Sequence, residues 1–224
     1  MTYNVGNGLA SPSRLAEMVR TSEADIIGLQ ELADEQEAGL RHQLGDEYPH
    51  QILHGTGIPG KGLLSRFPIL EGEQIYGHPT RPDLRATLDV GGRPLHVAVV
   101  HPEPPRLAAR GLQPRAHTGA QFDRLVGLLR HHLPLVLLGD FNMTRLQAQY
   151  RRVATAGLVD AFLVAGRGFG RTFPLRRGRV PLLPVLRLDY IWLSPELEVL
   201  TARVGADAGS DHLPVLADLR WPPC

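Results

Sequence analysis

Cysteine is nearly absent from this chain of 224 residues, in which Cys224 is both the last residue and the only cysteine. A single thiol excludes an internal disulfide framework and a cysteine-rich zinc site. The sequence has no uninterrupted apolar run long enough to span a bilayer. It opens as a strand, without the basic and apolar regions of a secretory signal. We therefore expect a cytoplasmic protein; a leader or anchor before Met1 would change that expectation.

Net charge and aromatic residues are also scarce. The 24 basic residues nearly cancel the 23 acidic ones, so the overall charge gives no reason to expect nucleic acid. Aromatic residues make up 6% of the chain, and few stand among the arginines, which disfavours a base-stacking platform for single strands. Binding of duplex backbone phosphates stays open. Lysine is limited to Lys61, and we attribute the general excess of arginine to composition rather than function.

Short apolar runs typical of strands alternate with amphipathic helices. Strands are expected at 1–5, 25–30, 50–54, 61–65, 69–76, 84–90, 94–100, 135–139, 188–193, 197–204 and 214–220. Helices are expected from Ser11 or Ser13 to about Arg20 and at 33–44, 115–131 and 145–156, with loops at 102–114 and 165–187. No linker or repeat divides the chain. We expect one domain over 1–224, of mixed α and β structure, with two packed, mostly antiparallel sheets and helices outside.

Polar side chains recur where the predicted strands end. They are Asn4, Glu31, His101, Asp140, Asn142, Asp189, Asp211 and His212. Taken singly, an Asp or Asn after a strand is most often a turn former or a helix cap, and His101 before a proline fits an ordinary loop. Gathered at one rim of a sandwich, these carboxylates and amides would suit a hard cation such as Mg²⁺.

Six short stretches contain these residues, and in their order along the chain they resemble the motifs of the endonuclease/exonuclease/phosphatase superfamily. This superfamily includes deoxyribonuclease I, exonuclease III-like repair nucleases, neutral sphingomyelinases and inositol phosphatases. The stretches are Tyr3-Asn4-Val5, Leu29-Gln30-Glu31, His101, Gly139-Asp140-Phe141-Asn142, Leu188-Asp189-Tyr190 and Ser210-Asp211-His212. Each motif is weak alone, but together they span nearly the whole chain. The resemblance implies a four-layered α/β/β/α sandwich with one or two Mg²⁺ or Mn²⁺ ions at one edge.

The resemblance also implies roles for these residues. Glu31 would be the principal metal ligand, with Asn4 ligating or orienting beside it and Asp211 as a further ligand. Asp140 and Asn142 would position the attacking water and a phosphoryl oxygen. His212, paired with Asp189, would act as the base or stabilise charge. His101 would donate to a non-bridging oxygen or assist the leaving group.

Three positions depart from the exonuclease III-like repair nucleases. Gly6 stands where those enzymes carry an acidic residue, Leu32 replaces a lysine, and His101 replaces a tyrosine. These departures favour the histidine-bearing branches, which are deoxyribonuclease I-like, sphingomyelinase-like and phosphatase-like.

Loop arginines are the candidates for substrate phosphate, because a guanidinium binds phosphate through two parallel hydrogen bonds. Arg106, Arg110 and Arg171 are the leading candidates, and Arg115, Arg176, Arg177, Arg179 and Arg187 are further ones. The alternative is a solvated charged loop. Apolar residues at 180–186 lie among these arginines and would allow transient contact with a membrane surface.

Three functions follow from these observations. The favoured one is a metal-dependent phosphodiesterase or phosphatase acting as a monomer on a small or lipid-linked phosphate ester by metal-assisted attack of water. The second is a non-specific deoxyribonuclease, in which nucleic acid is the substrate but is not favoured. The third, of a different class, is an inactive member that binds phosphorylated ligands; retention of the whole polar set argues against it.

Overall fold

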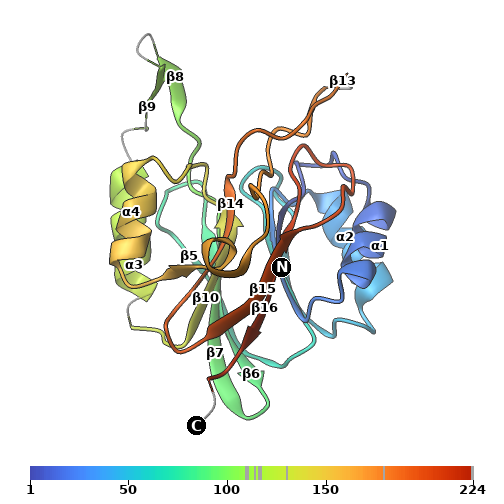
Figure 1. The fold of residues 1–224 in the computed structure, drawn as a ribbon. Helices are drawn as coiled ribbons and strands as arrows, with labels where there is room; N and C mark the ends of the chain where they lie inside the picture. The colour runs from blue at the N-terminus through green and yellow to red at the C-terminus, as the bar shows by residue number, and fades with distance from the viewer. Residues whose placement is uncertain (109–110, 114, 116–117, 130, 179, 223–224) are drawn as a thin grey trace.

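Two six-stranded mixed sheets pack face to face in the computed structural model, which describes all residues except 109–110, 114, 116–117, 130, 179 and 223–224 (Figure 1). The first sheet has the strand order β15 (Glu198–Val204), β16 (Val215–Arg220), β1 (Thr2–Asn4), β2 (Ile26–Gln30), β4 (Lys61–Ser65) and β3 (His50–His54). The second has the order β11 (Val159–Asp160), β14 (Asp189–Leu193), β10 (Leu135–Asp140), β7 (Arg93–Val100), β6 (Asp83–Val90) and β5 (Ile69–Ile75).

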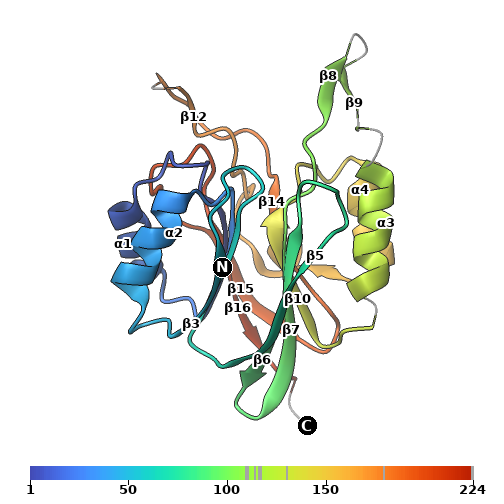
Figure 2. The ribbon, with the colours of Figure 1, turned by 180° about the vertical axis from the view of Figure 1, so that it is seen from behind.

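Helices cover the outer face of each sheet. The first pair is α1 (Pro12–Ser22) and α2 (Asp34–Leu44); the second is α3 (Thr118–Leu129) and α4 (Ala148–Thr155). The two pairs lie on opposite sides of the sheets (Figures 1 and 2). The short α5 (Ala161–Ala165) follows β11. The predicted four-layered sandwich is therefore confirmed, with most predicted elements within a few residues of their observed bounds.

The strand β10 shows why its sequence is an unbroken apolar run. Successive side chains of a strand point to opposite faces. Val136 and Leu138 belong to the core between the sheets, whereas Leu135 and Leu137 belong to the core beneath α3 and α4. Both faces of the strand are covered, so neither face requires polar residues.

Some short elements were not predicted. The expected loops contain the hairpins β8 (Arg106–Ala108) with β9 (Gly111–Gln113), and β12 (Arg176–Arg177) with β13 (Val180–Pro181). β11 and α5 were also missed. Segments of two to five residues are too short to show a periodic pattern. Both hairpins project from the same end of the molecule (Figure 2).

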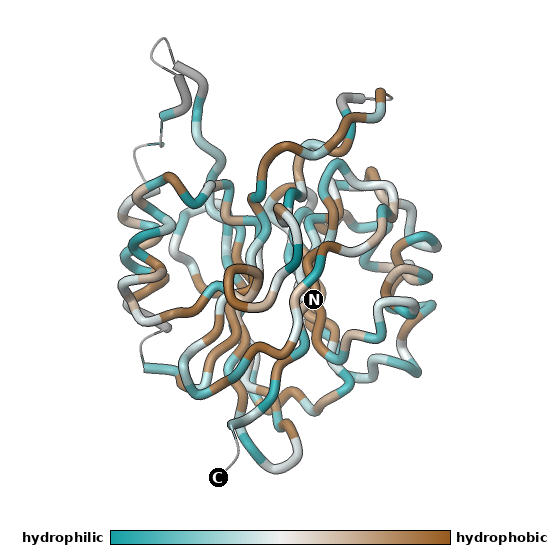
Figure 3. Tube along the Cα trace, in the orientation of Figure 1, coloured by the Kyte–Doolittle hydropathy of each residue, from teal (hydrophilic) through white to brown (hydrophobic). Residues whose placement is uncertain are grey.

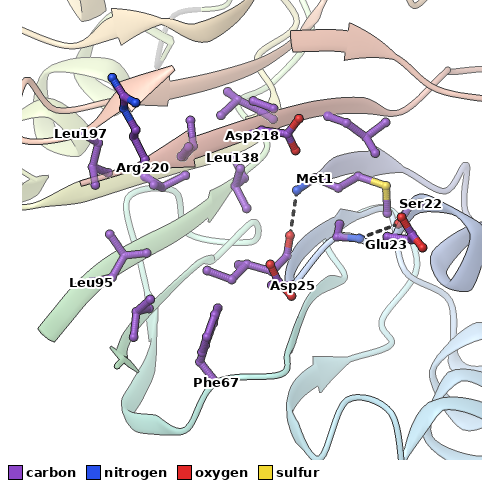
Figure 4. A pocket seen from close by; sticks show the side chains of 18 of the residues that line it. Met1, Ser22, Glu23, Asp25, Phe67, Leu95, Leu138, Leu197, Asp218 and Arg220 are labelled. Atoms are coloured by element: carbon purple, nitrogen blue, oxygen red, sulfur yellow. Dashed lines mark hydrogen bonds between the residues drawn. The ribbon is translucent and has the colours of Figure 1, made fainter. Parts of the chain in front are cut away.

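A cavity of about 810 Å³ opens between the sheets at the end where β1, β2 and β10 begin (Figure 4). Its apolar wall includes Leu95, Leu138 and Leu197, and Asp25 and Arg220 are among its charged residues. Among the described residues that line it, none is a histidine, asparagine or glutamine. The cavity therefore lacks the polar groups that the sequence pointed to, and those groups lie at the opposite ends of the same strands.

Among the described residues, none of the helices combines the length and hydropathy that crossing a bilayer requires.

A histidine pair formed by His96 of β7 and His132, in the connection before β10, is expected to make the fold sensitive to acid. The rings of His96 and His132 lie 5.1 Å apart, and Arg85 contacts His132. Burial, followed by the neighbouring positive groups, lowers the pKa of both imidazoles. These histidines therefore bind protons at a higher pH in the unfolded chain than in the folded one. As a result, the free energy of unfolding falls as the pH drops below 6.5, the pKa of an unperturbed histidine.

We expect urea denaturation to show a smaller acid-induced loss of stability for the double variant His96→Gln/His132→Gln than for the unaltered chain. His42→Gln, on the exposed side of α2, is the control. Equal losses in the double variant and the unaltered chain would contradict this interpretation.

Candidate active site

The candidate site lies where the central strands of both sheets end. β1 and β2 are parallel, with Asn4 opposite Gln30, and β7 and β10 are parallel, with Gly139 opposite Val100. Parallel strands end at a common edge, so side chains that follow them are brought together. A Cβ atom on Gly139 would lie 2.4 Å from the carbonyl oxygen of Val100, so glycine is required at this position, immediately before Asp140, the last residue of β10.

Asp140 is the centre of the site. Asn4 Nδ2 donates to Asp140 Oδ2 over 3.0 Å. The Nε2 atoms of His101 and His212 each lie 3.6 Å from the same oxygen. Burial raises the pKa of Asp140 to about 7; nearby His212 works against this rise and Asp189 adds to it. Three side chains far apart in sequence therefore converge on one carboxylate oxygen.

His212 is held by a second carboxylate. Its Nδ1 lies 2.9 Å from Asp189 Oδ2, and the ring of Phe173 lies 4.6 Å from the imidazole. Burial opposes the charged form, but the carboxylates of Asp189 and Asp140 outweigh burial and raise the pKa of His212 to about 10. The pairing fixes the orientation of the ring and leaves Nε2 directed toward Asp140.

His101 has the opposite electrostatic environment. Burial, reinforced by Lys61, Arg81 and His212, lowers its pKa well below 6.5. Its Nε2 lies 3.7 Å from Glu31 Oε1 as well as close to Asp140. The two histidines of the site therefore favour different protonation states, a neutral His101 and a charged His212.

Two non-glycine residues of the site have left-handed backbone conformations. Glu31 has a φ of 54° and Asn142 a φ of 48°. Such residues store strain and cluster at functional sites. The turn at Glu31 places a half-buried carboxylate at the end of β2; burial raises its pKa, and the amide of Asn4 offsets part of the rise. Asn142 donates its backbone N–H to Asp140 Oδ1 over 2.9 Å, and its Nδ2 donates to the carbonyl of Pro102.

The last loop is tied to β1 by a serine whose role the sequence did not reveal. Ser210 Oγ donates to the carbonyl of Asn4 over 2.7 Å and accepts from the backbone N–H of His212 over 3.2 Å. Asp211, next along the chain, lies close enough to Glu31 to raise its pKa. The loop thus brings a second carboxylate to the side of Glu31.

All eight predicted site residues lie at this end of the sandwich. The group of potential metal ligands that lies closest together there differs from the predicted ligands. Among the described side chains, the His, Cys, Asp and Glu groups whose ligand atoms lie within 4.8 Å of one another are Asp140, Asp189 and His212. This buried group could bind a metal ion. It shares no member with the predicted ligands Asn4, Glu31 and Asp211.

A buried positive cluster beside the site was not predicted. Lys61 is 1% exposed and donates to the carbonyl of Pro59 over 2.9 Å. Burial lowers its pKa to about 8, against the attraction of Asp83, whose own pKa burial raises to about 6. Arg81 lowers the pKa of both Glu31 and His101. The one available signal was the solitary lysine in an arginine-rich chain.

The loop arginines do not behave as one group. Arg106 and Arg171 are exposed, and Arg171 lies over the ring of Phe169 at 4.5 Å. Arg110 and Arg179 lie outside the described residues. Arg187 is buried in an ion pair with Asp160. The further candidate Arg187 is therefore a structural residue of the interior rather than a surface phosphate ligand.

The layered sheets and the polar cluster at their central strand ends define the class of phosphoesterases built on a four-layered sandwich. The chain belongs to the Endonuclease/Exonuclease/phosphatase family, whose model matches residues 1–212. Members of this family are phosphoesterases and nucleases. Among its relatives, the uncharacterized protein YbhP of Escherichia coli (strain K12) is 29% identical, over 98% of this chain and 94% of that protein.

Solved structures show the same fold. An endonuclease/exonuclease/phosphatase from Bacteroides vulgatus superposes with a TM-score of 0.79 at 21% identity, covering 99% of this chain and 97% of that one. The 3' phosphatase NExo from Neisseria, bound to a product DNA hairpin, has a TM-score of 0.76 at 21% identity. The mannosyl-6-phosphatase Bt3783 from Bacteroides thetaiotaomicron has a TM-score of 0.72 at 20% identity. For these last two, the match covers 98% of both chains.

Proposed function

We propose that this chain hydrolyses a small or lipid-linked phosphate ester, as a phosphodiesterase or phosphatase, at the site around Asp140. One observation carries the proposal: Asn4, His101 and His212 converge on a single oxygen of Asp140. A turn-forming aspartate would not require two buried histidines and a buried amide around it. Preorganised donors and acceptors of this kind act on developing charge.

A divalent cation, Mg²⁺ or Mn²⁺, fits the oxygen donors of Glu31, Asn4 and Asp211. When bound, such a cation offsets charge on the phosphoryl group and lowers the pKa of a bound water. We favour Glu31 and Asp211, with Asn4 ligating or orienting beside them, over the Asp140, Asp189 and His212 group, because His212 Nδ1 and Asp189 Oδ2 are already paired with each other. Asn4 Oδ1 already accepts from the backbone N–H of Gly6 and Asn4 Nδ2 donates to Asp140, which suits an orienting role. The Glu31 side chain is partly open to solvent, and the amide of Asn4 interacts with it.

The remaining residues then have distinct roles. Asp140 and Asn142 position the attacking water and a phosphoryl oxygen. His212, oriented by Asp189 and held in its charged form by Asp189 and Asp140, stabilises negative charge on phosphate rather than removing a proton from water. His101 donates from Nε2 to a non-bridging oxygen or to the leaving group. Arg81, whose Nη1 is buried without a hydrogen-bond partner among the described residues, is available to a substrate phosphate.

The test is hydrolysis of bis-para-nitrophenyl phosphate, para-nitrophenyl phosphate and plasmid DNA by the same protein. We expect turnover of at least one of the two small esters with Mg²⁺ or Mn²⁺, loss of activity in EDTA, and recovery when the metal is restored. Unchanged activity in EDTA would contradict the metal requirement, and absence of turnover on all substrates would favour the inactive phosphate-binding alternative.

A nuclease is the second candidate, because the similar Neisseria structure holds a DNA product. The near-zero net charge of this chain disfavours it. Plasmid cleavage much faster than hydrolysis of either small ester would establish the nuclease instead.

A further inference from the structure

The strongest unassigned feature is the arm, which we define as residues 173–186, including β12 and β13. Its base is closed by hydrogen bonds from Leu186 N to Phe173 O at 2.8 Å and from Val185 N to Phe173 O at 3.0 Å. Farther out, Leu182 N donates to Leu175 O over 2.7 Å. The arm projects beyond the body of the sandwich (Figure 1).

The outer part of the arm exposes aliphatic side chains. Leu183 is 86% exposed, and Val180 and Val185 are 61% and 60% exposed. Apolar residues mark this hairpin in the hydropathy-coloured trace (Figure 3). Several such side chains on one projecting hairpin form a local apolar surface rather than the scattered single exposures that are normal in proteins.

The charge of the segment around the arm is entirely positive. Between Ala161 and Leu188 the sequence contains no aspartate or glutamate but has arginines at positions 167, 171, 176, 177, 179 and 187. Arg187 is buried in its pair with Asp160 and Arg176 pairs with Asp207, so these two do not face headgroups, whereas Arg167 is exposed. Arg171, just before the arm, is exposed. The whole chain has a net charge of only +1, so this basic character is local. Apolar side chains next to arginines complement a bilayer interface that carries anionic headgroups.

The base of the arm is hydrogen-bonded to the loop that carries Ser210, Asp211 and His212. Leu175 N donates to Asp211 O over 2.7 Å, and Arg176 Nε donates to Ser210 O over 2.7 Å. Arg176 also pairs with Asp207 at 2.7 Å, and Phe173 contacts the ring of His212. A surface that receives the outer arm is therefore connected through a few hydrogen bonds to the residues around the candidate metal site.

We propose that the arm docks on an anionic lipid surface and that the site acts on a phosphate ester displayed there; the second half of this proposal rests on the proposed function above. The exposed apolar side chains of the arm, such as Val180 and Leu183, are aliphatic, whereas single-stranded nucleic acid is bound on aromatic platforms. Aliphatic side chains gain free energy on transfer from water into an apolar phase.

Vesicle co-sedimentation without turnover tests the docking. The unaltered chain should bind vesicles of phosphatidylcholine with phosphatidylglycerol, and less so at high salt, which screens the arginines. The variant Val180→Ser/Leu183→Ser should reduce binding roughly tenfold or more, since burial of one aliphatic side chain is worth at least a factor of this size. The control Leu146→Ser/Val164→Ser removes side chains of the same types with matching exposures, 88% and 59%, outside residues 173–186, and should bind normally.

Binding is separated from catalysis by Glu31→Gln, which should bind vesicles as the unaltered chain does while losing hydrolysis. Failure of the unaltered chain to bind, equal binding to phosphatidylcholine alone, or equal losses in the arm and control variants would each overturn the docking. So would an arm variant that loses affinity for DNA but not for vesicles. Hydrolysis of bis-para-nitrophenyl phosphate by a chain that does not bind vesicles would overturn the docking and leave the proposed function standing.

Discussion

Replacing Glu31 with glutamine is expected to reduce kcat/KM for phosphate-ester hydrolysis by roughly a thousandfold or more. Catalytic residues that act as a unit lose most of their combined rate enhancement when any one of them is removed. Glutamine keeps the size of the side chain and one oxygen but removes the charge that would hold a divalent cation. His212→Ala should cause a loss of similar size, since it removes the group that Asp189 orients toward Asp140. Steady-state kinetics with saturating Mg²⁺ would measure both effects.

The backbone of Glu31 supplies a control that separates catalysis from folding. Its φ of 54° is costly for a residue with a Cβ and not for glycine. Glu31→Gly should therefore abolish hydrolysis while raising the free energy of unfolding of the metal-free chain by about 1 kcal/mol. The Glu31 carboxylate is partly buried, and burial raises its pKa, so its removal should also raise the free energy of unfolding. Retained activity in Glu31→Gln or Glu31→Gly would remove Glu31 from the proposed site.

The second large effect concerns stability, at Asp160. Its carboxylate accepts from the backbone N–H groups of Phe162 and Leu163 at the start of α5, from Tyr150 Oη over 2.8 Å, and from the guanidinium of Arg187. Both partners of the ion pair are buried. Asp160→Asn leaves the Arg187 charge buried without its counter-charge, which should cost about 3–5 kcal/mol in the free energy of unfolding.

Urea denaturation at neutral pH would measure this loss, together with a decrease in Tm of roughly 6–20 °C for a domain of this size. Glu198→Gln is the matched control, because it breaks the exposed pair with Arg220, whose Nε lies 2.7 Å from Glu198 Oε2. That change should cost less than about 1 kcal/mol. Equal effects of the two substitutions would show that the Asp160 pair is no more important than a surface ion pair.

Much of the fold could be predicted because local patterns report on burial. The unbroken apolar run of β10 and the helical spacing at Phe122 and Leu125 in α3 follow from which faces the layers cover. The short β11 and α5 could not be predicted in this way. The capping interactions of Asp160 and its pairing with the distant Arg187 hold this region, and neither produces a periodic signal.

The set of candidate residues likewise came from the order of short motifs from Asn4 to His212, which a linear sequence can show. The hydrogen bonds between Asn4 and Asp140, 136 residues apart, and between Ser210 and Asn4, 206 residues apart, were decided by tertiary structure. So were the burial of Lys61 and the different environments of His101 and His212. A side chain's pKa and partners depend on how strands from distant parts of the chain pack, and this information is not contained in the spacing of residues.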